Sequence, residues 1–387
     1  MTGACYRRKR THAVAVCHRL GAATRCPHRG GAGQRPTPRA WERAGSVSTP
    51  EPWVVVGLDN GGTSNNATVL EGGGEFLVDR MVETPSRVQD GPDIAVEALG
   101  QAFDNVLDIT GRDRSSVRAV GLDTPGPASA NGVISSKGAT NFSQPAWRGF
   151  DIRGALEERL QLPVVYNNDA NAAALYAHHR YFGRAGAESS SISAIVGTGL
   201  GGGVVEAGQV IRGAAGMAGE LGHIPIPMEG LLAEGQPMPL CNCGFLGDAE
   251  SVASLTGIEQ NLLPYWLTRF AGHELASETP QKAARLVRTY GQLGDPLALA
   301  IFRQQATAIG RLFTIAANFT DPSAYFLGGG VVETQPRFRE WFLAEVRKHT
   351  ALREEQARVS TFALVPDLDM AGARGAAIAA QGALLRR

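Results

Sequence analysis

One pattern occurs twice in this chain: an apolar run, a glycine-rich turn and a second apolar run. The first copy, VVVGLDNGGTSNNATVL, occupies residues 54–70, and the second extends from about residue 190 to 213 around GTGLGGG. A single Asn-Gly turn between apolar runs is explained by an ordinary β-hairpin. Its recurrence in two halves of one chain predicts duplication of an α/β unit, with the two halves facing each other across a cleft.

The periodicity of the apolar residues is typical of mixed sheets with helical cover. Within the first half, we expect strands at 53–58, 67–70, 76–82 and 118–122, a helix at 92–110 and another helix at DIRGALEERL, followed by the extended segment LPVVYNND. Within the second half, we expect helices at 280–293, 295–319, 336–349 and 371–385, and strands at AYFLGGGVV and at 358–365.

The charge distribution divides the chain at about residue 50. Residues 1–50 carry ten Lys or Arg and one acid, whereas the remainder carries 27 basic and 36 acidic residues. An acidic body argues against a nucleic-acid partner. No apolar run approaches the about 18 residues of a membrane span, so we expect a cytoplasmic protein without a membrane partner.

The basic arm at residues 1–50 is rich in Gly and Pro and has three interpretations: a binding tail, a transit peptide, or sequence that is not translated. We favour the last, with Val47 as an alternative start, and otherwise expect the arm to be disordered. Its Cys and His residues lack the flanking pattern of a metal site.

Three glycine turns are candidate phosphate contacts: DNGGT from Asp59, GTGLGGG from Gly197 and LGGGVV from Leu327. Each alone is explained by structure. At corresponding places in two halves, the first two are better explained as loops whose backbone N–H groups approach phosphate oxygens. Asp59 would contact the phosphates through Mg²⁺. The other phosphate contacts would come from backbone N–H groups and two threonine hydroxyls, at Gly61, Gly62, Thr63, Gly197, Thr198 and Gly199. GTGLGG also matches a dinucleotide-binding motif, but strand-like rather than helical sequence follows it.

Asp169 lies where the segment YNNDANAAAL passes from an extended run into an alanine-rich helix. Its carboxylate either caps the helix or accepts the proton of a substrate hydroxyl that attacks a phosphoryl group. In the second interpretation, Asn168 holds a neighbouring hydroxyl. Further along the chain, AGELGH places Glu220 and His223 three residues apart, on one face if the segment is helical.

The segment LCNCGFLGDAE contains a possible zinc site. Cys241 and Cys243, with His223 upstream, supply three ligands, and Asp248 can supply a fourth. The alternative is a pair of reduced cysteines in a cytosolic loop.

These motifs together resemble the ROK family of sugar kinases, within the actin/hexokinase/Hsp70-like (ribonuclease H-like) superfamily. The resemblance runs from about Val54 to the C-terminus through DNGGT, NDANAAAL, GTGLGGG, AGELGH and CNCGFLGDAE, in that order. It implies an α/β fold of two lobes around an ATP and substrate cleft, with an N-terminal lobe at 51–167 plus 371–387 and a C-terminal lobe at 168–370 that carries the zinc loop at 241–250.

The resemblance also implies roles for individual residues. Asp169 becomes the general base, and the contacts to ring hydroxyls become Asn141, Asn168, Glu220, His223 and Glu250. His223 also joins the zinc ligands, and Gly328 and Gly329 lie against the adenosine. Family members of this kind transfer the γ-phosphate of ATP, with Mg²⁺ and structural Zn²⁺, and we expect a homodimer or homotetramer.

Two departures from the family pattern bear on the substrate. Asp248 stands where the family has a third cysteine, and SNN follows Thr63 where glucokinases of the family generally have a lysine or similar residue. With these departures we hypothesise a C7-cyclitol of the valienone or validone type, in antibiotic biosynthesis, as the acceptor. Glucose and an N-acylmannosamine are the alternatives. A ROK-type transcriptional regulator is the remote one, because residues 1–50 are too short for a winged-helix domain.

Overall fold

The computed structural model describes residues 53–126, 128–135 and 141–386. The predicted basic arm at 1–50 lies outside these residues. The described residues belong to one compact unit, Pro50–Arg387. Among the described residues, no helix is both long and apolar enough to cross a bilayer.

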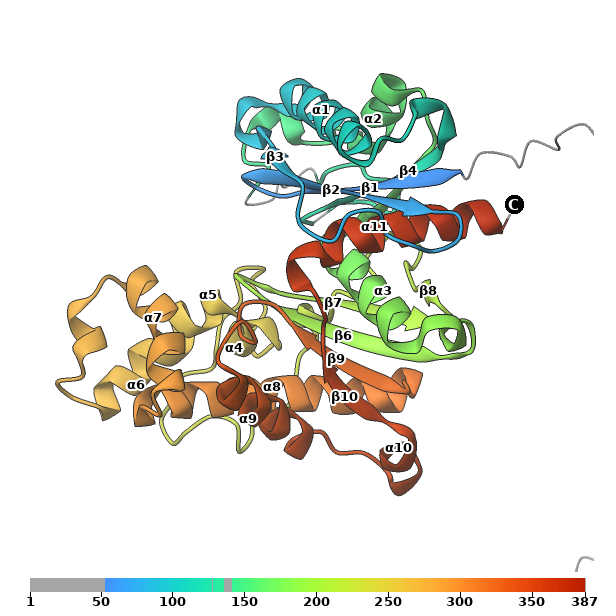
Figure 1. The fold of residues 1–387 in the computed structure, drawn as a ribbon. Coiled ribbons are helices and arrows are strands. Elements are labelled where there is room, and N and C mark those ends of the chain that lie inside the picture. The colour runs from blue at the N-terminus through green and yellow to red at the C-terminus, as the bar shows by residue number, and fades with distance from the viewer. Residues whose placement is uncertain (1–52, 127, 136–140, 387) are drawn as a thin grey trace, which may run out of the picture. The chain divides into compact units, whose positions relative to one another are not determined.

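The predicted duplication is visible in two five-stranded sheets with corresponding strand orders, β3-β2-β1-β4-β5 and β10-β9-β6-β7-β8 (Figure 1). In each sheet a central strand pairs antiparallel with its hairpin partner and parallel with a later strand. The first sheet comprises β1 (Val54–Asn60), β2 (Ser64–Glu71), β3 (Glu83–Pro85), β4 (Val117–Thr124) and β5 (Val164–Asn168). The second comprises β6 (Ser190–Val196), β7 (Leu200–Glu206), β8 (Gln209–Val210), β9 (Ala324–Gly328) and β10 (Thr361–Leu364).

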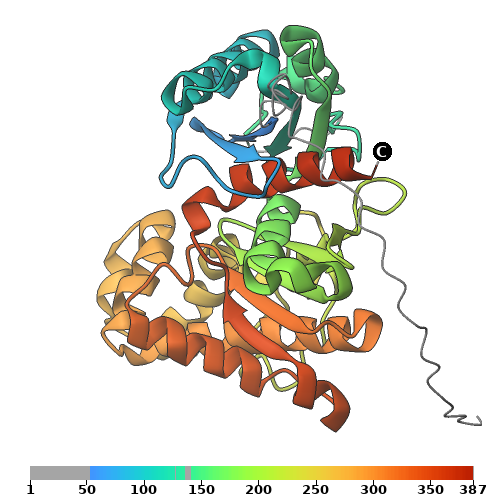
Figure 2. The ribbon, with the colours of Figure 1, turned by 45° about the vertical axis from the view of Figure 1, so that its right-hand side comes forward.

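Helices form the layers around these sheets, as Figures 1 and 2 show. One face of the first sheet is covered by α1 (Pro92–Thr110) and α2 (Ile152–Leu160), and its other face by α11 (Leu368–Leu385). Helix α3 (Asp169–Phe182) packs between α11 and strands β6 and β7. The remaining helices extend the second half: α4 (Glu250–Ala253), α5 (Leu255–Gly257), α6 (Leu263–Arg269), α7 (Pro280–Gln292), α8 (Pro296–Thr320), α9 (Pro336–Lys348) and α10 (Glu354–Val359).

Three apolar clusters hold the layers together. One joins the first sheet to α1 and α2, one joins the second sheet to α7, α8 and α9, and a third lies around α3 and α11. This third cluster is built from small residues, so the two helices approach closely. A Cβ on Gly375 of α11 would lie 1.8 Å from the carbonyl oxygen of Ala172 in α3. Only glycine fits that contact.

The prediction of a strand at 76–82 is wrong. This segment has a single bridge, between Leu70 and Phe76, and β3 begins only at Glu83. Two backbone bonds still join this segment to β2: Leu77 N–H donates to the carbonyl of Val69 at 2.9 Å, and Ala67 N–H donates to the carbonyl of Val82 at 3.1 Å. Side chains bond to other backbone groups, since the N–H of Val82 donates to Asn66 Oδ1 at 3.1 Å and Arg374 donates to the carbonyl of Val78 at 3.2 Å. The regular ladder of a strand is therefore interrupted, and side chains satisfy part of the backbone.

Smaller differences have local causes. The predicted strand AYFLGGGVV ends at Gly328, because Gly329 has a φ of 88° and turns the chain away from the sheet. The strand expected at 358–365 is shortened to β10, since residues up to Val359 form α10. The last helix begins at Leu368, three residues before the predicted start.

Candidate active site

Asp169 is the first residue of α3, directly after β5. The cap of this helix is Asn168, whose side-chain oxygen accepts from the N–H of Asn171 at 2.8 Å. The structural explanation for Asp169 as the cap is therefore wrong: the neighbouring asparagine fills that role. Asp169 Oδ1 accepts from the adjacent N–H of Ala170, at 2.7 Å.

The Asp169 residue is exposed to solvent. Desolvation of its carboxyl group by the neighbouring protein nevertheless raises its pKa to about 7; the N–H of Ala170 opposes the rise, and the charges of Asp59 and Glu220 add to it. A carboxylate with a pKa near neutrality can accept a proton from a molecule in the cleft.

Half-buried Asp59 and fully buried Asp123 form a carboxylate pair at the ends of two parallel strands, β1 and β4, where they are register partners. Both face helix α11. A Cβ on Gly372 would lie 2.7 Å from Asp59 Oδ2 and 3.3 Å from Asp123 Oδ2. Asp123 is fully buried, and within the described part of the chain neither of its oxygens accepts a hydrogen bond.

Burial raises the pKa of Asp59 to about 6, although contact with Asp123 partly lowers it. Burial also raises the pKa of Asp123 well above its usual value, and the charges of Asp59 and Asp169 add to the rise. Two such carboxylates are satisfied by a shared proton or by a cation. The donor set therefore suits Mg²⁺, which prefers carboxylate oxygens.

The first glycine turn, Gly61 to Thr63, joins β1 to β2. The N–H of Gly61 donates to the carbonyl of Ser64 at 2.9 Å, which closes the turn. A Cβ on Gly62 would lie 2.7 Å from Asn141 Oδ1, so the structure brings the predicted substrate contact Asn141 beside this turn. Thr63 is exposed.

The second glycine turn joins β6 to β7 and, as expected from its sequence, leads into a strand. Gly197 and Thr198 are exposed, and their carbonyl groups accept from the N–H groups of Leu255 and Thr256 at 3.0 and 3.1 Å. These bonds hold the turn against α5. Glu250 lies beside it, because its Oε2 accepts from the N–H of Leu200 at 2.8 Å.

A cavity of about 200 Å³ opens beside the second glycine turn. Its lining is mostly apolar and comes from the turn, α5, α7, α8 and the segment after β9: Val196, Gly197, Thr198, Leu255, Ile258, Ala284, Arg285, Arg288, Phe302, Gln305, Gly330 and Val331. Gly330 and Val331 line it, whereas Gly329 packs behind, where a Cβ would lie 2.2 Å from the carbonyl oxygen of Val196. The predicted adenosine contacts Gly328 and Gly329 are thus adjacent to the cavity.

Gln305 gives this cavity a polar group. Its amide nitrogen donates to the carbonyl of Ala253 at 2.6 Å, which fixes the orientation of the amide. Its Oε1 is buried and has no hydrogen-bond partner among the described residues. An apolar cavity with one unpartnered acceptor suits a flat ring that carries an N–H donor, such as adenine.

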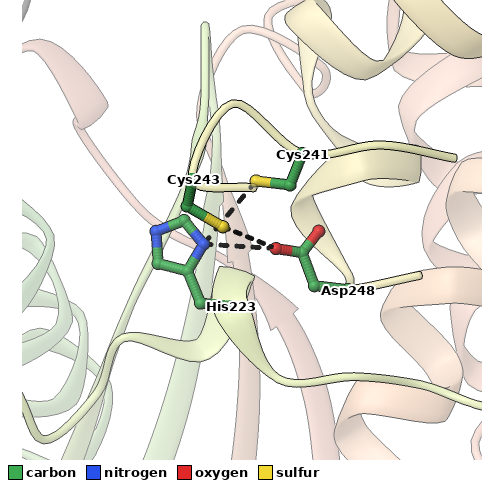
Figure 3. A group of neighbouring side chains, drawn as sticks. All are labelled: His223, Cys241, Cys243 and Asp248. Carbon is green, nitrogen blue, oxygen red and sulfur yellow. Dashed lines mark hydrogen bonds and ion pairs between the residues drawn. The ribbon is translucent and has the colours of Figure 1, made fainter. Parts of the chain in front are cut away.

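The four predicted zinc ligands come together (Figure 3). One ligand atom from each of His223, Cys241, Cys243 and Asp248 lies within 4.8 Å of all the others. His223 Nδ1 is 3.3 Å from Asp248 Oδ2 and 3.8 Å from Cys241 Sγ. The other oxygen of Asp248 accepts from the N–H of Ser251 at 2.8 Å, which orients the carboxylate. Two sulfurs, one imidazole nitrogen and one oxygen fit the ligand preferences of zinc.

Glu220 precedes a single 3-10 turn, Leu221–His223, and His223 ends it, so the two residues do not share an α-helical face. His223 directs Nδ1 toward the cysteines and leaves Nε2 for another contact. Burial raises the pKa of Glu220; the charge of His223 opposes this rise and that of Glu250 adds to it. The structure therefore groups Glu220, His223 and Glu250 near the second glycine turn.

Sequence reasoning missed Asp123 and Gln305. The only signal for Asp123 is that a lone carboxylate follows the apolar run AVGL, as Asp59 follows VVVGL. Gln305 lies in the long helix α8, and a polar residue in a helix is normally predicted to lie on its solvent-exposed face. No pattern in the sequence marks it as buried.

Comparison with known proteins places this geometry in a family. The family model described as the ROK family matches residues 55–383. A glucokinase of Halalkalibacterium halodurans is 34% identical over 283 residues, which cover 72% of this chain and 80% of that protein. An N-acetylmannosamine kinase of Escherichia coli is 28% identical over 85% of this chain and 99% of that protein.

Two solved structures of ROK proteins also match this chain. A ROK hexokinase from Thermus thermophilus matches with a TM-score of 0.67 and 32% identity over 86% of this chain and all of that chain. A ROK family glucokinase from Streptomyces griseus, in complex with glucose and AMPPNP, matches with a TM-score of 0.61 and 29% identity over 85% of this chain and 99% of that chain.

Proposed function

The chain belongs to the ROK family, and on that premise we propose that it is an ATP-dependent sugar kinase that phosphorylates the primary hydroxyl of a glucose-like ring. The observation that carries this proposal is the position of Asp169. Asn168 caps the helix in its place, and the pKa of Asp169 is raised to about 7. The carboxylate is therefore available to a substrate hydroxyl.

In this mechanism Asp169 accepts the proton of the attacking hydroxyl, and the turns at Gly61 and Gly197 position the phosphates with backbone N–H groups. Phosphoryl transfer depends mainly on positioning and on neutralising the phosphate charge, so these turns are as important as the base. Asn141 and Asn168 at one side, and Glu220, His223 and Glu250 at the other, supply hydrogen-bonding groups for ring hydroxyls.

Two metal ions are part of the proposal. Mg²⁺, when bound, neutralises charge on the phosphate oxygens. Asp59 would hold it with Asp123 alongside, because Asp59 is half-buried, Asp123 is fully buried, and neither carboxylate forms an ion pair with a Lys or Arg in the described structure. Structural Zn²⁺ would be held by His223, Cys241, Cys243 and Asp248. That ion would fix the loop that carries Glu250 and orient His223 toward the cleft.

For the acceptor we propose glucose first, supported by the glucokinase at 34% identity. An N-acylated mannosamine is the alternative that the kinase at 28% identity supports. The sequence SNN after Thr63, which departs from the family pattern, was the reason to consider a C7-cyclitol. In the structure both asparagines form hydrogen bonds within the protein. Asn65 accepts from Asn60 at 2.6 Å, and Asn66 donates to the carbonyl of Asp369 at 3.0 Å. The cyclitol is therefore kept as a second acceptor to be assayed.

The test is a steady-state assay with MgATP and a panel of acceptors: glucose, N-acetylmannosamine, N-acetylglucosamine and a valienone-type cyclitol. Specificity is the ratio of kcat/KM between acceptors. We expect Asp169→Asn to lower kcat/KM about 10²- to 10⁴-fold, while acceptor binding measured by calorimetry persists. The matched control, Asp108→Asn on the exposed surface of α1, should retain full activity.

Two results would overturn the proposal. Turnover by Asp169→Asn at the rate of the parent protein would remove the base from the mechanism. Binding of a sugar without phosphorylation of any acceptor in the panel would favour the transcriptional regulator instead.

A further inference from the structure

A second cavity, of about 920 Å³, lies away from the residues assigned to catalysis. Its lining comes from β5, the end of α3, the segment around β8 and the end of α11, together with Asn131 and Arg153. It contains neither Asp169 nor any residue of the two glycine turns. The kinase proposal leaves this cavity without a role.

The charge of this cavity is one-sided. Arg153, Arg184, Arg212 and Arg386 line it, and among the described residues no Asp or Glu does. Arg153 is paired with Glu157 at 2.7 Å. The other three arginines form no ion pair within the described ranges of the chain. A cavity lined by charges of one sign concentrates the field of those charges and attracts ions of the opposite sign.

The guanidinium group of Arg212 is half-buried and has another positive charge near it. Burial lowers the pKa of Arg212, and the charge of Arg386 lowers it further. Arginine is normally found with an anion when it is removed from water. An oxyanion that contacts both groups would remove the repulsion and could form the paired hydrogen bonds that guanidinium favours.

Asn167 supplies an independent observation at the same place. Its side-chain oxygen accepts from Arg212 Nη2 at 3.0 Å, which fixes the amide. Its amide nitrogen is buried and has no partner among the described residues. The residue is 5% exposed and lines the cavity. A buried N–H donor in a cavity lined by arginines lacks the acceptor that an oxyanion would provide.

We propose that this cavity binds a small oxyanion, a phosphate or carboxylate group of a metabolite, through Arg212, Arg386 and the Asn167 amide. The site is separate from the one that holds ATP and sugar. It nevertheless touches the catalytic segment, since Asn167 comes two residues before Asp169 in the same strand-to-helix passage.

The test is calorimetric titration of the full chain with inorganic phosphate and, separately, with citrate, at constant ionic strength set by sodium chloride. The two anions distinguish a phosphate site from a carboxylate site. Variants Arg212→Gln and Arg386→Gln remove the two cations. Arg386 is exposed at the end of α11, so its variant should fold even if Arg212→Gln does not.

Two further variants separate this site from other phosphate binding. Thr198→Val alters the second glycine turn, and Arg118→Gln removes an exposed arginine of β4 that does not line the cavity. We expect one anion to bind the parent protein, Thr198→Val and Arg118→Gln with the same dissociation constant. In Arg212→Gln and Arg386→Gln that constant should rise at least about tenfold.

The outcomes are distinct from those of the kinase assay. Loss of binding only in Thr198→Val would mean that the anion occupies the kinase cleft, and would overturn the inference. Equal binding by all variants, or no binding beyond that of chloride, would also overturn it. Neither outcome would change the assignment of Asp169.

Discussion

The contact between α11 and α3 predicts opposite effects for the same substitution at two glycines of one helix. In Gly375→Ala the new Cβ would lie 1.8 Å from the carbonyl oxygen of Ala172, whereas real Cβ atoms essentially never approach a heavy atom closer than 3.0 Å. The two helices must therefore separate by about 1 Å. In Gly382→Ala the nearest atom is Arg386 Nη1 at 3.1 Å, the end of a flexible side chain that can move.

The magnitudes follow from packing and helix propensity. Overpacking typically costs about 1–3 kcal/mol, and alanine in place of glycine inside a helix returns about 0.5–1 kcal/mol. The free energy of unfolding of Gly375→Ala should thus fall by about 1–2 kcal/mol. That of Gly382→Ala should rise by about 0.5 kcal/mol, because its site is near the helix end.

Activity should report the same displacement. Asp169 begins α3 and lies three residues before Ala172, so separating the helices moves the base. A misplacement of about 1 Å can lower a rate about 100-fold. Urea unfolding gives the stability of both variants, and the acceptor assay gives kcat/KM. The reasoning is refuted if Gly375→Ala is as stable and as active as Gly382→Ala.

Three other predictions concern the site. With a pKa of about 7 on Asp169, kcat/KM for the acceptor should rise about tenfold between pH 6 and pH 8. Glu220→Gln removes a charge that raises this pKa, so the rise in kcat/KM should occur at lower pH in that variant. An unchanged pH profile in Glu220→Gln would contradict the electrostatic coupling. Elemental analysis should find about one zinc per chain, with Cys243→Ser losing most of it, and a parent protein free of zinc would exclude the metal. Gln305→Leu should raise the KM for ATP about tenfold and lower the ratio of kcat/KM for ATP to kcat/KM for GTP. An unaltered KM for ATP would show that Gln305 does not recognise the base.

Much of the fold could be predicted because the information is local. Apolar alternation on both sides of Asn60-Gly61-Gly62 predicts β1 and β2, and a helix start at Asp169 follows from its place between LPVVYNN and an alanine-rich run. The same local pattern failed at 76–82, where some backbone groups bond to β2 and others bond to the side chains of Asn66 and Arg374. Arg374 is about 300 residues distant in sequence, and no local pattern contains it.

The site shows the same division between local and distant information. The motif CNC and the upstream histidine predict a four-ligand group, because the types of ligand and their spacing are visible in one part of the sequence. Asp123 was missed because its importance lies in the parallel register that pairs it with Asp59, 64 positions earlier. Its burial comes from α11, a helix at the other end of the chain.

The place of α11 has a consequence for the order of folding. This helix covers the face of the first sheet that α1 and α2 leave open, yet it begins at Leu368, about 300 residues after β1. Closing so long a loop is entropically costly and slow compared with pairing a hairpin. During synthesis the apolar face of the sheet that contains Val55 and Ala119 therefore stays uncovered until the last helix has been made. A nascent chain of this kind should depend on chaperones until residues 368–385 arrive and join the two halves.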